Sequence, residues 1–174
     1  MKRSVGLWAL VGFAATSLLG TLLHFLYDWL GESALIAPFS GVNESTWEHM
    51  KLLFWPMLLF GILQSFFFRS YESFWCVQQS GILIGLFLIP ILFYTYNGAI
   101  GKSPDFVNIA IFFLSAAVAY IYEAKKLKSG TAACEHPKRS IGVLLFLALL
   151  FVLFTYFPPR IGLFKDPLTG TYGI

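Results

Sequence analysis

VGLWALVGFAATSLLGTLL, residues 5–23, is a run of nineteen residues without a charged side chain. About 20 predominantly apolar residues are enough for a helix to cross the hydrocarbon core of a bilayer. The run is also longer than the apolar region of about 7–15 residues in a typical signal peptide. It therefore predicts a retained transmembrane helix that extends over 5–30.

Four further apolar segments follow the first one, at 47–68, 74–96, 106–122 and 141–157. Of the 174 residues, 57% are hydrophobic and 12% are charged, whereas soluble domains have about 25% charged residues. This composition excludes a soluble enzyme, a disordered chain and a disulfide-rich secreted domain. The sequence predicts an all-α, polytopic transmembrane helix bundle with five spans, formed by residues 1–174 as a single integral membrane domain.

The basic residues predict the orientation of the bundle. An N-terminus inside the cell places eight of the 12 Lys and Arg residues on the inner side: Lys2, Arg3, Arg69, Lys125, Lys126, Lys128, Lys138 and Arg139. The other four would be outside: Lys51, Lys102, Arg160 and Lys165. Since cytoplasmic loops carry the excess of positive charge, we expect an N-in, C-out protein with an outer loop at 31–46 and an outer tail at 158–174.

Cys76 and Cys134 have neither the number nor the spacing of a zinc knuckle or a disulfide framework. The predicted orientation puts both on the reducing side, so no disulfide is expected between them. The net charge of +3 belongs to the inner loops of a membrane protein, so the lipid bilayer and not nucleic acid is the expected partner.

A polar stripe follows the first span, where Ser17, Thr21, His24 and Asp28 are spaced by four, three and four residues. This spacing places them on one helix face, and such a face usually points into the bundle or a wet cavity. For His24 and Asp28 two interpretations remain open, a hydrogen bond that fixes the following loop and ligand or proton chemistry. Asn108, in the fourth span, is expected to form hydrogen bonds between helices.

A second group of ionisable residues lies in NESTWEHMK, residues 43–51. Ser45 and Glu48 have the spacing of a capping box, in which both side chains bind free N–H groups at the start of a helix. Capping alone does not require Glu44, His49 and Lys51 as well. Helix capping and a functional site are both retained as interpretations of this segment.

The first span runs outward and the second runs inward, so the two groups meet at the outer interface. Two imidazoles with a carboxylate suit a divalent, zinc-like metal that leaves one position open for water. We therefore predict His24, Glu48 and His49 as metal ligands, with Asp28 or Glu44 orienting a ligand or serving as a base. The predicted protein is a metal-dependent membrane hydrolase acting on a lipid-like substrate. The alternative is a non-enzymatic protein that binds or transports a cation, a proton or a small polar solute.

Three features beyond this site carry expectations. The long loop at 31–46 is expected to be interfacial or re-entrant, because bare backbone in lipid is costly. The tail, with its turn-forming residues and apolar anchors, is expected to fold onto the outer surface, either as plain packing or as a lid over the ionisable groups. Gly12, Ala15 and Gly20 permit close helix approach on the first span, which is consistent with a homodimer.

Three motifs carry a resemblance to a known group of proteins. They are HxxYDW at 24–29, NESxWEHxK at 43–51, and PP…DPxTGxYG in the tail at 158–173. On these motifs the chain resembles an uncharacterised family of small bacterial multi-pass membrane proteins. The resemblance covers nearly the whole chain and implies a location in the bacterial inner (cytoplasmic) membrane. It implies no activity, substrate or catalytic residue.

Overall fold

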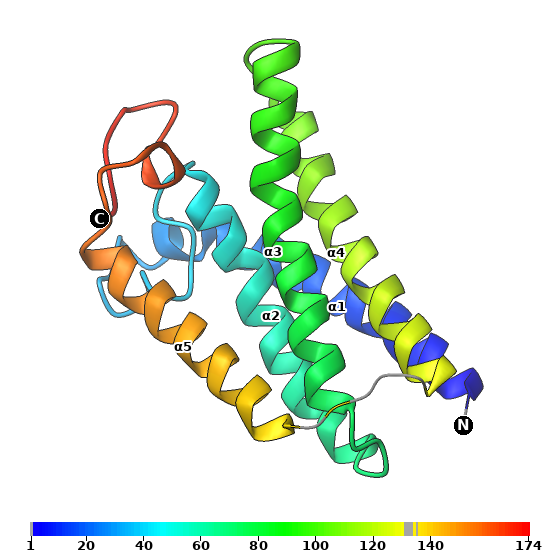
Figure 1. The fold of residues 1–174 in the computed structure, drawn as a ribbon. Helices are drawn as coiled ribbons and strands as arrows, with labels where there is room; N and C mark the ends of the chain where they lie inside the picture. The colour runs from blue at the N-terminus through cyan, green and yellow to red at the C-terminus, as the bar shows by residue number, and fades with distance from the viewer. Residues whose placement is uncertain (1, 131–133, 135) are drawn as a thin grey trace.

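The computed structural model describes residues 2–130, 134 and 136–174. Within them the helices are α1 (Lys2–Trp29), α2 (Thr46–Phe67), α3 (Phe74–Ala99), α4 (Asp105–Ser129), α5 (Pro137–Tyr156) and the short 3-10 helix η1 (Gly162–Phe164) (Figure 1). Each of the five α-helices is long and apolar enough to cross a membrane. The prediction of an all-α bundle with five helices long and apolar enough to span a membrane is confirmed for the described residues.

The helix ends follow local chemistry more than hydropathy. α4 continues past the predicted end at 122 through its lysine-rich last turns. It stops where Gly130 adopts the left-handed conformation (φ 65°), which ends a helix. α5 begins at Pro137, before the predicted start at 141, because proline is well tolerated in the first turn of a helix. α2 begins after Ser45, whose hydroxyl accepts a hydrogen bond from the Glu48 N–H.

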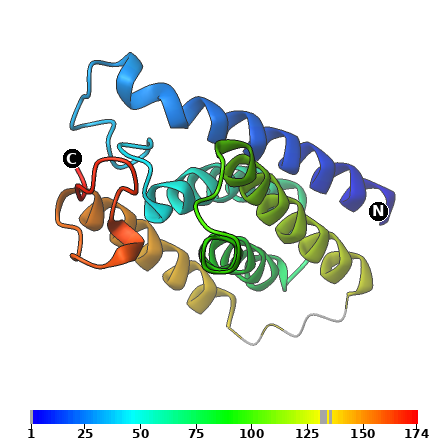
Figure 2. The same ribbon diagram turned by 90° about the horizontal axis from the view of Figure 1, so that it is seen from above.

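α2 is the most buried of the five helices. It packs against α1 and α3, while α4 packs against α1 and α3 and α5 packs against α3 (Figures 1 and 2). Aromatic rings join α2 to α5, with the Phe54 and Trp47 rings 4.8 and 4.5 Å from the Phe151 ring. The core of the bundle is therefore built around α2.

α1 and α4 lie close together near the N-terminus and diverge toward their other ends (Figure 1). Two glycines of α1 make the approach possible, since a Cβ at Gly12 would lie 2.5 Å from the Tyr120 ring and one at Gly20 would lie 2.5 Å from the Phe112 ring. These glycines are used for packing within the chain. Beyond Gly20 the two helices separate, and this leaves room for a cavity.

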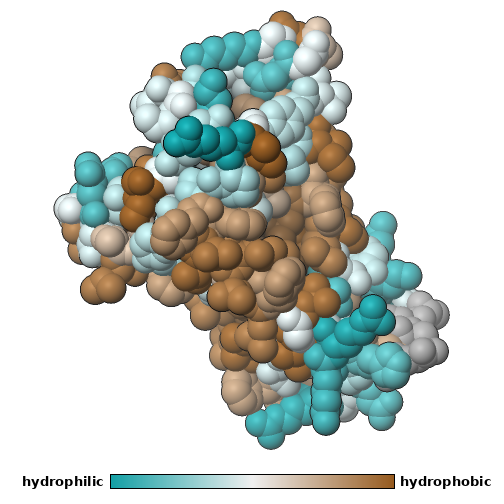
Figure 3. Space-filling model, turned by 60° about the vertical axis from the view of Figure 1, so that its left-hand side comes forward, coloured by the Kyte–Doolittle hydropathy of each residue, from teal (hydrophilic) through white to brown (hydrophobic). Residues whose placement is uncertain are grey.

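The surface of the bundle has a broad apolar band between two polar ends (Figure 3). Large apolar side chains such as Leu10, Leu18, Phe87 and Leu149 are more than half exposed there. Such an arrangement is unfavourable in water and suits a protein whose middle is covered by lipid. We call the polar end that carries the C-terminal tail the tail end of the bundle.

The 31–45 segment folds back over the tail end as a series of turns. Its backbone is tied to α1 by a hydrogen bond from Gly41 N to Leu23 O (3.1 Å), and to α2 by one from Trp55 Nε1 to Pro38 O (2.8 Å). The C-terminal tail packs beside it, with Phe164 buried 4.7 Å from the Trp47 ring. Asn43 Nδ2 donates to Gly173 O (3.1 Å), which joins the two segments.

The expectation about the cysteines was wrong. Cys76, near the start of α3, forms a disulfide with Cys134, shortly before α5. The fold brings their Cα atoms to 5.9 Å, a separation that a disulfide spans readily. Sequence spacing alone gave no sign of this proximity, because the two residues are 58 positions apart.

Candidate functional site

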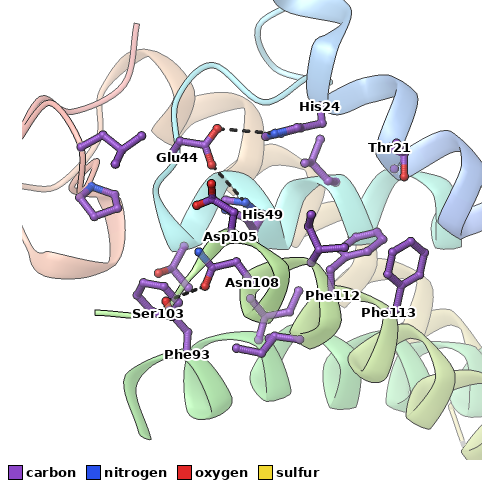
Figure 4. A pocket seen from close by; sticks show the side chains of 18 of the residues that line it. Thr21, His24, Glu44, His49, Phe93, Ser103, Asp105, Asn108, Phe112 and Phe113 are labelled. Carbon is purple, nitrogen blue, oxygen red and sulfur yellow. Dashed lines mark hydrogen bonds and ion pairs between the residues drawn. The ribbon is translucent and has the colours of Figure 1, made fainter. Parts of the chain in front are cut away.

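A cavity of about 490 Å³ opens at the tail end, between the diverging ends of α1 and α4 (Figure 4). Leu52 of α2, Ile89 and Phe93 of α3, and Phe112 and Phe113 of α4 form much of its apolar wall. Its polar lining is gathered toward the loops: Thr21, His24, Glu44, Thr46, His49, Asn97, Lys102, Ser103, Asp105 and Asn108. Pro167 and Leu168 of the tail complete the lining. The cavity is thus amphipathic, with most of its polar groups at the end near the loops and Thr21 nearer the apolar end (Figure 4).

His24, Glu44 and His49 meet inside this polar end, and we call them the His–Glu–His cluster. Glu44 lies between the two imidazoles, with Oε1 3.5 Å from His24 Nε2 and Oε2 3.5 Å from His49 Nε2 (Figure 4). The centres of the two rings are 5.8 Å apart. These distances are longer than direct hydrogen bonds, so a water molecule or small shifts of the side chains would complete the contacts.

The protonation of His49 follows from its second contact. His49 Nδ1 lies 2.9 Å from the carbonyl oxygen of Ser45, and because a carbonyl only accepts, Nδ1 carries the hydrogen. In a neutral ring Nε2 is then a lone pair, and it faces a carboxylate oxygen of Glu44. The two acceptors attract each other only through an added proton, a cation or a water molecule. The contact between Glu44 and His49 therefore leaves a place for one of these three between the two side chains.

The turn before α2 positions Glu44. Asn43 Oδ1 accepts a hydrogen bond from Ser45 N (2.9 Å), and Ser45 Oγ accepts one from Glu48 N (3.4 Å). The predicted capping by Ser45 is confirmed, but the box is not reciprocal because Glu48 Oε2 accepts from Val42 N instead (3.1 Å). The turn leaves Glu44 just outside the helix, beside His24.

Glu48 is not part of the cluster. Its carboxylate lies 2.5 Å from Lys51 Nζ, and both side chains are buried. Lys51 Nζ also donates to Ala37 O (2.7 Å) and Thr155 Oγ1 (3.1 Å). Glu48 and Lys51 thus form a buried ion pair that is fully engaged in holding α2, the 31–45 segment and α5 together.

Asp28 is also separate from the cluster. It is exposed in the last turn of α1 and does not line the cavity. Of the five residues predicted for the site, the structure therefore brings together His24, Glu44 and His49, and it places Glu48 and Asp28 elsewhere. In the part of the chain that the structure describes, no group of three or more His, Cys, Asp or Glu side chains forms a metal site. The zinc-like ion stays a prediction from the sequence.

The connection between α3 and α4 and the helix turns beside it contribute polar groups that the sequence analysis did not assign to the site, although it expected Asn108 to form hydrogen bonds between helices. Asn97, Ser103 and Asn108 form a chain of hydrogen bonds along the cavity wall, and Lys102 and Asp105 lie at the same rim. The sequence analysis treated this segment as a short loop between two spans, and the loop contains no recognised motif. The sequence feature that could have indicated its role is the cluster of polar residues in 97–108, which lies at the same end of the bundle as His24.

The comparison with known sequences covers the entire chain, since residues 1–174 match a single family. The chain belongs to DUF6512, a family of unknown function. The expected membership in an uncharacterised family is thereby confirmed. No curated protein and no solved structure matches this DUF6512 chain. A function for this DUF6512 member is therefore inferred from the cavity itself.

Proposed function

We propose that this protein is a membrane-embedded hydrolase that binds a lipid-like amphiphile in the tail-end cavity and cleaves it at its polar end. The observation that carries the proposal is the position of the His–Glu–His cluster at the polar end of an otherwise apolar cavity. Most small-molecule sites have this composition, with an apolar lining and few convergent polar groups.

The cavity borders the apolar band of the surface. Phe25 of α1 and Ile109 of α4 line it, and these side chains are 43% and 56% exposed. A ligand dissolved in the membrane would reach the cavity between these two helices without crossing water. Its hydrocarbon part would lie against Phe112 and Phe113, where each buried CH₂ group contributes about 0.8 kcal/mol.

The cluster would supply acid–base chemistry at the other end of the ligand. One imidazole removes a proton from a water molecule, whose oxygen attacks the carbonyl carbon of the ligand. The bond from that carbon to the leaving oxygen or nitrogen then breaks, and the leaving group takes up the proton to give a free acid and an alcohol or amine. Glu44 stabilises the imidazolium that forms on either side of it. Positioned general acid–base groups contribute roughly 10²- to 10⁴-fold in rate.

If the zinc-like ion expected from the sequence is bound, its carboxylate ligand would differ from the one predicted. Because Glu48 is paired with Lys51, the carboxylate ligand beside His24 and His49 would be Glu44. The ion would acidify the attacking water. Metal analysis of the purified protein, with His24→Gln and Glu44→Gln variants compared with Glu48→Gln, tests this assignment.

A second candidate function is the binding or transport of a proton or cation without hydrolysis. It is favoured by one observation, the carboxylate of Glu44 that lies between two imidazole nitrogens. This arrangement takes up positive charge whether or not an amphiphile is present. The two functions differ in whether a covalent product is released.

The experiment incubates the purified protein with vesicles that contain phosphatidylethanolamine, phosphatidylglycerol, diacylglycerol and monoacylglycerol, and identifies bound lipids and released products by mass spectrometry. We expect product from the wild type, and we expect His24→Gln and Glu44→Gln to lose it while retaining bound lipid. Glu72→Gln is the matched control, since Glu72 is exposed and does not line the cavity. Bound lipid without product from the wild type would favour the second candidate, and absence of both would refute the proposal.

A further inference from the structure

We infer that Asn108 presents its amide NH₂ group to the cavity as a hydrogen-bond donor for a carbonyl oxygen, and that the ligand is a neutral ester or amide amphiphile. The inference deepens the proposed function, and it rests on that proposal for the presence of an amphiphile in the cavity.

The orientation of the Asn108 amide follows from a chain of hydrogen bonds that starts at a backbone N–H. Ser103 N donates to Asn97 Oδ1 (2.8 Å), which fixes which end of the Asn97 amide is oxygen. Asn97 Nδ2 must then be the donor to Phe93 O (2.7 Å) and Ser103 Oγ (3.2 Å). Ser103 Oγ in turn donates a hydrogen bond to Asn108 Oδ1 (2.7 Å).

Because Ser103 donates to the oxygen of the Asn108 amide, the NH₂ group is the end of this side chain that can donate to another partner. None of the hydrogen bonds among the described residues uses Asn108 Nδ2. Asn108 lines the cavity and lies across it from Glu44 and His24 (Figure 4). Ser103, which holds it, is 6% exposed, so the amide is anchored from behind by a buried hydroxyl. A donor held in this way is ready for an acceptor on a ligand.

The charges around the cavity favour an uncharged acceptor. The carboxylates of Glu44 and Asp105 face the cavity, and Lys102 is the cation at the same rim. Among the Asp, Glu, Lys and Arg side chains that line the cavity, two are acidic and one is basic, so a carboxylate or phosphate head would meet more like charge than opposite charge. A neutral carbonyl accepts from Asn108 without that penalty.

This placement also fits the proposed reaction. A carbonyl oxygen bound to Asn108 directs the carbonyl carbon toward the His–Glu–His cluster on the opposite wall. As water adds to the carbon, the oxygen gains negative charge, and a donor that is already oriented stabilises it more strongly than the ground state. Asn108 would therefore affect the rate constant of the chemical step as well as binding.

The test compares three probes of the same chain length: monooleoylglycerol, its ether analogue 1-O-oleylglycerol, and oleate. Their affinities are measured by competition at low temperature, with mass spectrometry to verify that the ester is intact. We expect the wild type to bind the ester about five- to tenfold more tightly than the ether, the size of one neutral hydrogen bond. We expect oleate to bind more weakly than the ester.

Asn108→Leu keeps a similar volume and removes the donor, so it should bind the ester and the ether equally. Ser103→Ala leaves Asn108 in place without its anchor and should lose part of the preference. Gln79→Leu is the matched control, because it removes an amide from α3 that does not line the cavity. If hydrolysis is observed, Asn108→Leu should lower kcat more than it raises KM.

The outcomes separate this inference from the proposed function. Equal affinity of the wild type for ester and ether, or a preference that persists in Asn108→Leu, overturns the role of Asn108 while amphiphile binding stands. Tightest binding of oleate overturns the neutral ligand. No binding of any of the three probes contradicts the proposed function. If Asn108→Leu fails to fold, Ser103→Ala alone decides, and an unchanged preference in that variant overturns the inference.

Discussion

Glu48 and Lys51 are bound to each other inside the bundle, with 2.5 Å between Oε2 and Nζ. They are one helical turn apart on α2, and their side chains are 3% and 0% exposed. The backbone of Ala37 and the hydroxyl of Thr155 complete the shell around the lysine. A carboxylate that the sequence suggested as a metal ligand thus lies in an ion pair that connects three segments of the chain.

Breaking this pair should destabilise the fold strongly. Lys51→Met leaves Glu48 buried without its cation, a change that costs about 3–5 kcal/mol in other proteins. Removing both charges in the Glu48→Gln/Lys51→Met double variant should restore much of the loss. Thermal unfolding in detergent measures both effects, with Glu72→Gln as the control. Additive losses in the double variant would show that the two residues do not act as a pair.

The sequence predicted the fold well because five long apolar runs have no other stable arrangement in a membrane than helices. It also placed His24, Glu44 and His49 at one end, since consecutive spans run in opposite directions. The sequence did not separate Glu48 from these three residues. Glu48 is held by Lys51, and Lys51 is held in turn by Thr155, which is 104 residues away in the sequence. The contribution of Asn108 likewise depends on Ser103 and Asn97, whose proximity is a property of the folded turn.

Asp28 and Glu44 should differ in their importance for function. Asp28 is exposed outside the cavity, so Asp28→Asn should change stability by less than about 0.5 kcal/mol and leave lipid turnover unchanged. Glu44→Gln, an equally conservative change within the cluster, should abolish turnover. The measurements are thermal midpoint and product release. Loss of turnover in Asp28→Asn would return that residue to the site.

The C-terminal tail should be necessary for a closed cavity. Phe164 is buried against Trp47 and Phe154, so Phe164→Ala should cost about 3–5 kcal/mol of stability. Leu168 lines the cavity but is 65% exposed, so Leu168→Ala should weaken amphiphile binding with little effect on the thermal midpoint. If both variants lost only stability, or both lost only amphiphile binding, the tail would not combine packing with cavity closure.

The predicted orientation can be tested by labelling single cysteines in a Cys76→Ser/Cys134→Ser background. Lys128→Cys should react with a membrane-impermeant reagent only after the cells are opened, because the excess of basic residues favours the inner side for that end. Thr171→Cys should react in intact cells. The reverse pattern would establish an N-out, C-in protein.

The disulfide provides an independent check on the same orientation. The structure contains the Cys76–Cys134 disulfide, which a reducing cytoplasm would convert to thiols, so thiols should be found in growing cells only if this end of the bundle faces the cytoplasm. Alkylation before lysis should then block them, whereas alkylation after exposure to air should find the disulfide. A disulfide already complete before lysis would indicate that this end faces an oxidising compartment.

The shell around Lys51 has a consequence for biosynthesis. Thr155 is made 104 residues after Lys51, so the ribosome must complete α3, α4 and nearly all of α5 before the lysine has its last partner. Until then, α2 carries an ion pair that is only partly enclosed, and the end of the bundle with the cavity stays open. Chains that stop before α5 should therefore be recognised as unfinished by membrane proteases, and the cavity should be complete only after Pro167 and Leu168 have been made.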